Sequence, residues 1–461
     1  MNKKNNSANH YQIAGAPEGI EPFIISALAE GRALTDLWSK QDPTQSPTHS
    51  PRDVIFVARD DVHMARISET LKFFAPTIHV HTFPAWDCLP YDRVSPRADI
   101  IGQRIQTLTQ LLDDQKTPQK IPKNKPGKVL LTTVSAILQR VPPREAFANA
   151  TMEIALNQRL DPEILIKFLN HHGYGRAETV MEPGEYAVRG GIFDVFPSGC
   201  DTPFRLDFFG DELETIRAFD PTTQRTTHQA QSLAFKPISE INLNEASISR
   251  FRSAYRELFG AVAKEDPLYE SISAGRRHMG MEHWLALFYD SLDTIFDYLP
   301  NAAIVLDHQA DASIDARHDL IGEYYIARAN IAEQGIGGEA LLYNPVPPDR
   351  LYLNAEEWQS RLVSCDVGKL SPFDLPDETE NTVSLGAKPG RDFADARVRT
   401  DMSVFEALNE FTEAETKAGR RVLITAFSEG ARDRLVAQLI DQGLEATQVV
   451  SDWEEYLNLQ P

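Results

Sequence analysis

The sequence predicts a multidomain α/β protein whose largest unit is a parallel β-sheet covered by helices. Apolar runs at residues 54–58 and 302–307 have the length of buried strands, and helical patterns follow them at 64–71 and 312–332. This alternation of strand and helix is typical of a parallel sheet. Residues 184–212 instead alternate apolar and polar side chains around paired glycines, which indicates antiparallel strands and a second domain.

Length and composition are those of a large globular protein. At 461 residues the chain exceeds one ordinary core, and 42% of its residues are hydrophobic. The 67 acidic side chains outnumber the 46 basic ones, which gives a formal net charge of -21. Such a charge disfavours broad contact with the phosphate backbone of nucleic acid.

Cysteine usage and hydropathy exclude several classes of protein. Cys88, Cys200 and Cys365 show no C-x-x-C spacing, so neither a zinc site nor a disulfide framework is expected, and a reducing cytoplasm fits. The first residues lead into no apolar signal segment, and the sequence has no run of about 18 apolar residues. We therefore predict a cytoplasmic protein without a bound metal or a membrane partner.

The first predicted strand and helix flank a loop in the place of a phosphate-binding loop. Laying the template G-x-x-x-x-G-K-[ST] on Gly15 puts Ile20 at the second glycine, Glu21 at the lysine and Pro22 at the hydroxyl. Glu21 would repel phosphate, Ile20 would block close approach, and Pro22 has neither an N–H nor a hydroxyl. Two interpretations remain: a nucleotide loop that has lost its nucleotide, or an ordinary strand–turn–helix. Both predict that ATP does not bind here.

The strand that ends at Asp307 adds a second observation of this kind. An active NTPase carries an acidic pair at the end of such a strand to hold magnesium and activate water. In this sequence the second residue of the pair is His308. We therefore predict no catalytic residue, no cofactor and no hydrolysis in this chain.

The β-rich stretch carries a resemblance to a known family. Its sequence from residue 184 is GEYAVRGGIFDVFP, followed from residue 203 by PFRLDFFGDELE and by IRAFD at 216–220. These residues resemble the second domain of the bacterial transcription-repair coupling factor, a domain shared with component B of the excision nuclease. The resemblance implies a domain that binds component A of that nuclease, with Arg189, Arg205 and Phe209 at the contact positions. The alternative is that the arginines pair with neighbouring carboxylates (Glu185, Asp207 or Glu212) and that Phe209 belongs to the core.

The resemblance also implies a division of the chain. Residues 1–151 and 238–355 are expected to form one degenerate P-loop-NTPase-like sheet domain, with a small α+β domain, residues 152–237, inserted between them. Residues 356–461 are expected to hold a linker at 370–388 and a further small α/β domain. Its elements would include a strand at 421–426 and a helix capped by Ser428.

In this family the full-length protein senses stalled RNA polymerase, releases it with an ATP-driven motor and recruits the excision nuclease. None of the motor's motifs occurs before Pro461, so we expect this chain to be the N-terminal part of such a protein. ATP, magnesium, RNA polymerase and double-stranded DNA would then be bound by other regions. The protein's own C-terminal domain would cover the docking surface until activation.

The alternative function is a divergent component B of the excision nuclease, an ATP-dependent DNA-loading protein. It would need a nucleotide site, which Glu21, Pro22 and His308 speak against. It would also need a long tyrosine-bearing hairpin, for which the short connection at residues 92–100 leaves no room.

Overall fold

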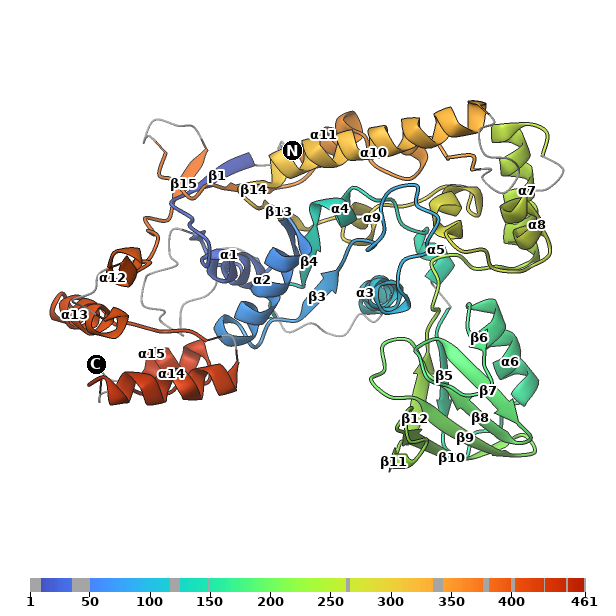
Figure 1. Ribbon diagram of the computed structural model, residues 1–461, viewed down its shortest axis with the longest axis horizontal. Helices are drawn as coiled ribbons and strands as arrows, with labels where there is room; N and C mark the ends of the chain where they lie inside the picture. The colour runs from blue at the N-terminus through green and yellow to red at the C-terminus, as the bar shows by residue number, and fades with distance from the viewer. Residues whose placement is uncertain are drawn as a thin grey trace, which may run out of the picture.

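The computed structural model describes residues 10–34, 50–116, 125–147, 150–262, 266–334, 343–375, 381–398, 403–426, 428–444 and 447–459. Three sheets and the helices around them form a multidomain α/β structure, which confirms the predicted fold class (Figure 1). Within the described residues, no helix combines the length and the apolar character needed to cross a membrane.

The largest sheet has seven strands in the order β15-β1-β14-β13-β2-β4-β3, all paired in parallel. Its strands are β1 (His10–Ala14), β2 (Val54–Ala58), β3 (Val80–Phe83), β4 (Val129–Thr133), β13 (Ala303–Leu306), β14 (Val367–Leu370) and β15 (Thr382–Ser384). The predicted strands at 54–58 and 302–307 are therefore confirmed as central strands. Both are buried along their whole length, as strands covered on two faces must be.

Helices cover both faces of this sheet, because the side chains of each strand alternate between two apolar cores. In β2, Val54 and Phe56 belong to one core, whereas Ile55 and Val57 belong to the other. The first core is closed by α1 (Glu21–Glu30) and α2 (Asp61–Phe74). The second is closed by α3 (Ala98–Lys116), α4 (Val134–Ile137), α9 (Ile295–Tyr298) and α11 (Ala355–Val363).

The sheet extends beyond the expected segment boundary at residue 355. Strand β14 lies between β1 and β13, and β15 pairs with the other edge of β1. The prediction of a linker over residues 370–388 is therefore wrong in its described part, because this stretch supplies an edge strand. The domain boundaries as such remain predictions.

The inserted region has its own core and two sheets. Its six-stranded sheet has the order β11-β10-β9-β8-β7-β6, and β5 pairs with β12 in a two-stranded sheet. Helix α6 begins after Asp161, whose side chain accepts the Glu163 N–H, and Pro162 stands in its first turn. The elements are β5 (Met152–Ala155), α6 (Pro162–His171), β6 (Gly175–Arg176), β7 (Glu185–Arg189), β8 (Ile192–Val195), β9 (Phe204–Phe209), β10 (Glu212–Phe219), β11 (Thr226–Gln229) and β12 (Ser232–Phe235).

A helical layer with a third core follows the inserted domain. It consists of α7 (Glu245–Phe259), α8 (Pro267–Ser273) and a 3-10 segment (Met281–Leu287), over which the long helix α10 (Ala310–Gln334) passes. The short helix α5 (Arg144–Phe147) precedes the crossing into the inserted domain. Residues 236–242 lead back out of that domain, and their buried Glu240 pairs with the fully buried Arg104 of α3 at 2.5 Å.

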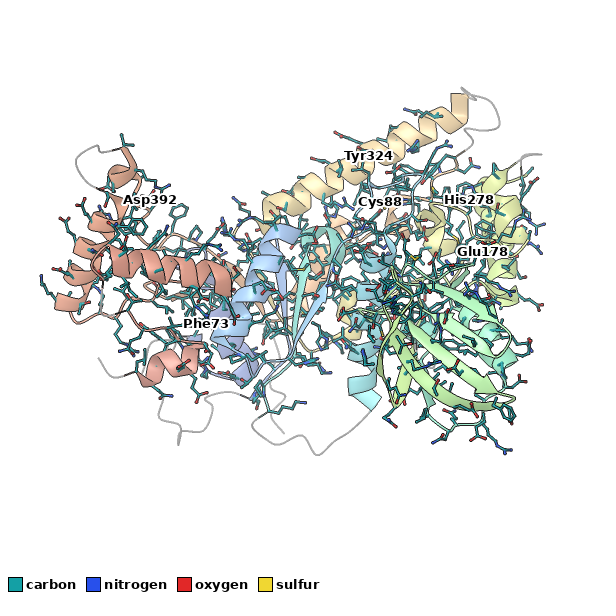
Figure 2. The ribbon with its side chains drawn as sticks, turned by 60° about the horizontal axis from the view of Figure 1, so that its bottom comes forward. Phe73, Cys88, Glu178, His278, Tyr324 and Asp392 are labelled. Carbon is teal, nitrogen blue, oxygen red and sulfur yellow. The ribbon has the colours of Figure 1, made fainter. Side chains whose placement is uncertain are left out.

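The last described segment is helical and packs on the first helices of the chain. Its helices are α12 (Ala394–Val398), α13 (Val404–Lys417), α14 (Glu429–Asp441) and α15 (Trp453–Asn458). The Trp453 ring lies 5.1 Å from Phe23 of α1 and 5.4 Å from Phe74 of α2, next to the Phe73 that Figure 2 labels. The cap of α14 by Ser428 is confirmed.

The predicted strand at residues 421–426 is wrong. The run is apolar and β-branched, which favours a strand. A strand also needs a partner for its N–H and C=O groups, and no described segment forms a ladder with this one. Its side chains are half-buried or exposed, so no core holds it in place.

Candidate functional site

The phosphate-loop position, residues 15–22, is closed by contacts with the chain itself. Gly15 has a φ of 60° and donates its N–H to the Phe373 carbonyl at 3.1 Å, while Ala16 donates to the Ser371 carbonyl at 2.8 Å. A Cβ atom on Gly15 would lie 2.7 Å from the Asp374 carboxylate. The start of this loop therefore faces the segment after β14 rather than open solvent.

Glu21 supplies an internal anion at the helix end where a phosphate would bind. Its carboxylate accepts the Gly19 N–H at 2.7 Å, and its residue exposure is 4%. Pro22 stands in the first turn of α1, and Ile20, at the N-cap, is also buried. The bonded N–H precedes the helix, but a carboxylate in the first turn of α1 complements the positive end of the helix dipole, as a phosphate would. The acidic side chain therefore takes the place of the anion that it was expected to repel.

The same carboxylate belongs to a buried ionic cluster, formed by Glu21, His63, Asp307 and Arg59. Nε2 of His63 lies 2.9 Å from Asp307 Oδ2 and 3.5 Å from Glu21 Oε1. Neither His63 Nε2 nor Asp307 Oδ2 makes a hydrogen bond, so these contacts are ion pairs without hydrogen-bond geometry. Arg59 adds a second cation, with Nη1 3.5 Å from Asp307 Oδ2.

Charge balance in this cluster favours a protonated His63. Burial opposes the charge, but the Asp307 and Glu21 carboxylates outweigh it and raise the pKa of His63 to about 9. For Asp307, burial also works against the charge, yet the contact with His63 and the Gln309 N–H lower the pKa of the carboxyl. His308, which stands where an acidic residue was sought, places Nδ1 3.2 Å from Asp307 Oδ1.

The sequence-predicted positions Gly15, Ile20, Glu21, Pro22, Asp307 and His308 thus meet at one edge of the sheet. Of these positions, Glu21 and Asp307 are neutralised by His63 and Arg59, which were not among the predicted residues, and such a buried cluster of balanced charges is suited to holding the fold together. Among the described residues, no group of His, Cys, Asp and Glu is arranged to hold a metal ion. The absence of a cofactor in this chain remains a prediction.

The second candidate site lies on the six-stranded sheet of the inserted domain. One side of this sheet packs on α6 and contributes Tyr186, Phe193, Leu206 and Leu213 to the core. The side chains that alternate with these core positions form the opposite side, here called the outer face: Arg189, Ile192, Asp194, Arg205, Asp207, Phe209 and Arg217.

Strand register explains which of these side chains meet. Arg205 of β9 lies opposite both Asp194 of β8 and Arg217 of β10. Asp207 lies opposite Ile192, which in turn lies opposite Arg189 of β7. Directly opposed residues on neighbouring strands project to the same face. The predicted contact residues therefore share one surface.

Each predicted contact residue has a different environment. Phe209 has 76% of its surface exposed, so the alternative that it is a core residue is wrong. Arg189 is exposed and donates to the Glu178 carbonyl, at the residue labelled in Figure 2, and to Thr179 Oγ1 at 3.4 Å. Arg205 is bound to Asp194, at 2.6 Å from Nε and 2.9 Å from Nη2.

The carboxylate partners named from the sequence differ from those found. Arg205 pairs with Asp194 instead of Glu185, Asp207 or Glu212, and Asp207 accepts hydrogen bonds from Arg217 and Thr215. Sequence reasoning missed Asp194, the 40% exposed Ile192 and Arg217 as members of the outer face. The alternation of side chains along a strand, counted from Arg205, was the signal available for assigning residues to this face. That alternation does not show which residues on neighbouring strands lie next to each other.

Comparison with known proteins shows which family the inserted region matches. Residues 152–240 match the family model of the UvrB interaction domain. The chain is 31% identical over 310 residues to the transcription-repair-coupling factor of Rickettsia bellii, covering 67% of this chain and 26% of that protein. The corresponding protein of Haemophilus influenzae is 32% identical over 311 residues, with 67% and 25% covered. That of Escherichia coli is 31% identical over 384 residues, with 83% and 31% covered.

The chain thus spans between a quarter and a third of the length of these curated relatives. The residues that match the family model include the β-rich stretch on which the resemblance seen in the sequence rests. The chain is therefore a relative of the transcription-repair-coupling factors and carries a UvrB interaction domain at residues 152–240.

Proposed function

We propose that this chain recruits the excision nuclease by binding its component A through the outer face of the inserted domain. The observation that carries the proposal is the combination of the interaction-domain match with an exposed Phe209 on the same sheet face as Arg189 and Arg205. An exposed aromatic ring offers an apolar anchor, and arginines offer hydrogen bonds to partner carboxylates. Aromatic and arginine side chains are common among the residues that contribute most of the binding energy of an interface.

The recruitment would take place in the cytoplasm at lesions where RNA polymerase has stalled. In this proposal the sheet domain is a scaffold that neither binds nor hydrolyses ATP, because Glu21 and His63 occupy the nucleotide position with charges of the chain itself. Polymerase release, DNA translocation and the ATP and magnesium that they require would belong to the remaining length of the coupling factor. Its C-terminal domain would cover the outer face before activation.

The connection between β3 and α3 favours a coupling factor over a divergent component B of the excision nuclease. All residues from 84 to 97 are described, and none of them lies in a strand. A DNA-gripping hairpin is therefore absent from this place. The relatives reported above are coupling factors as well.

The test is isothermal titration of the chain with component A of the excision nuclease. We expect the parent to bind and the double variant Arg189→Glu, Arg205→Glu to lose about 2 kcal/mol or more, the size of interface hot spots. Lys167→Glu is the matched control, because Lys167 is an exposed cation on α6, the helix that covers the opposite side of the sheet. Absence of binding by the folded parent would refute the proposal, and an equal loss in the control would show a non-specific charge effect.

A further inference from the structure

The contacts of Arg205 leave one edge of its guanidinium for a partner. Nε and Nη2 donate to the two oxygens of Asp194, and no described residue accepts a hydrogen bond from Nη1. The Arg205 side chain is 21% exposed, whereas that of Asp194 is 4% exposed. The carboxylate is thus more deeply buried than the arginine, and Arg205 Nη1 is not one of the fully buried nitrogens that lack a partner, so solvent reaches it.

An aromatic ring limits the movement of the same guanidinium. The central carbon of Arg205 lies 4.9 Å from the centre of the Phe219 ring. Phe219 itself is fully buried and packs with Val180, Ala187 and Phe196 in a small cluster of their own. A planar cation on an aromatic face with a bidentate carboxylate at its side has little rotational freedom left.

We propose that Asp194 is a positioning residue, which holds Arg205 in the orientation that a carboxylate of the partner recognises. This inference rests on the proposed function. It explains why Asp194, an acidic residue, belongs to a surface that should attract acidic groups of the partner. A fixed arginine loses little side-chain entropy on binding, so the orientation supplied by Asp194 favours the complex.

Positioning and simple charge complementarity predict opposite results when Asp194 loses its charge. The change Asp194→Asn makes the outer face more positive by one unit. If net charge alone governed recognition of an acidic partner, association would become faster and binding tighter. If Asp194 fixes Arg205, the complex dissociates faster because the guanidinium is no longer held.

Asp207→Asn is the matched control. It removes the same charge from the same face of the sheet. Asp207 lies two residues from Arg205 on β9, but its carboxylate bonds Arg217 and Thr215 rather than Arg205. A second variant, Arg205→Lys, keeps the positive charge but removes the planar group that Asp194 grips. Urea unfolding of each variant checks that the domain stays folded.

The experiment measures association and dissociation rates of the full chain with component A of the excision nuclease by surface plasmon resonance. For Asp194→Asn we expect dissociation about tenfold faster or more, with an association rate equal to or above that of the parent. Asp207→Asn should speed dissociation by a smaller factor than Asp194→Asn, because it leaves the two hydrogen bonds between Arg205 and Asp194 intact. In the Arg205→Lys background, Asp194→Asn should add no further loss, since both changes act through one contact.

Equal effects of Asp194→Asn and Asp207→Asn would overturn the inference. So would additive losses in the double variant, or tighter binding by Asp194→Asn. These results leave the proposed function standing, because the parent still binds. A folded parent that does not bind component A would instead refute the proposed function, and this inference with it.

Discussion

The buried His63 makes stability depend on pH in a defined direction. The ring is 5% exposed and contacts Glu21 on α1 and Asp307 after β13. Arg59, ahead of the helix that carries His63, pairs with the same Asp307 and with Asp60. Its pKa rises from the ordinary 6.5 to about 9 in the folded state. Below pH 6.5 both folded and unfolded chains carry the proton, and the stabilisation is complete. Between pH 6.5 and 9 only the folded chain keeps it, so stability falls as pH rises.

The size of this effect follows from the shift in pKa. A difference of one pKa unit corresponds to about 1.4 kcal/mol, so the shift of His63 is worth about 3 kcal/mol. The change His63→Gln removes the proton but keeps a polar side chain. We therefore expect the stability advantage of the parent over this variant to shrink by about 3 kcal/mol between pH 6 and pH 9.5.

Urea unfolding followed by circular dichroism, at matched pH values for parent and variant, measures that difference. Other titrations cancel in the comparison. His172 and His283, whose pKa values burial lowers to about 4, act in a separate window below pH 6.5. A pH-independent difference for His63→Gln, or a His63 ring that titrates near 6.5 by NMR, would refute the reasoning.

Three further outcomes are expected. Phe209→Ala should leave the free energy of unfolding within about 0.5 kcal/mol of the parent, because the side chain is exposed, but should weaken binding to component A of the excision nuclease by more than about 1 kcal/mol in titration calorimetry. Glu240→Ala should lower the free energy of unfolding in urea by about 3–5 kcal/mol, because the buried Arg104 loses its counter-charge; a loss below about 1 kcal/mol would contradict this. Calorimetry with millimolar Mg-ATP should show no binding to this chain, and any saturable heat would contradict the self-closed loop at Glu21.

The sequence was sufficient for elements whose signal is local. Strands such as β2 and β4 are apolar runs of the right length, and the helix start at Asp161 follows from an aspartate placed before a proline. The loop at Gly15 could be assessed by testing the chemistry of each template position. In such cases the deciding interactions lie within a few residues of one another.

Features that depend on distant partners could not be predicted. Strands β14 and β15 have four and three residues, too few for a periodic pattern. They form because β14 pairs with both β1 and β13, and β15 pairs with the other edge of β1. At residues 421–426 the opposite occurred, since strand-like residues found no partner among the described segments. The pairing of Arg205 with Asp194 depends on the register between β8 and β9. In each case the physical cause is a backbone or charge contact that the local sequence does not contain.

The position of β1 in the sheet sets an order for events during synthesis. Its neighbours are β14 and β15, and His10 bonds the Leu362 carbonyl, 352 residues further along the chain. At about 5–20 residues per second on a ribosome, the first strand waits on the order of tens of seconds for its neighbours. The inserted domain is complete long before then. The inserted domain can thus fold on the nascent chain while the sheet domain around it is still incomplete, and a chaperone that binds the unpaired N-terminal segment has that interval in which to do so.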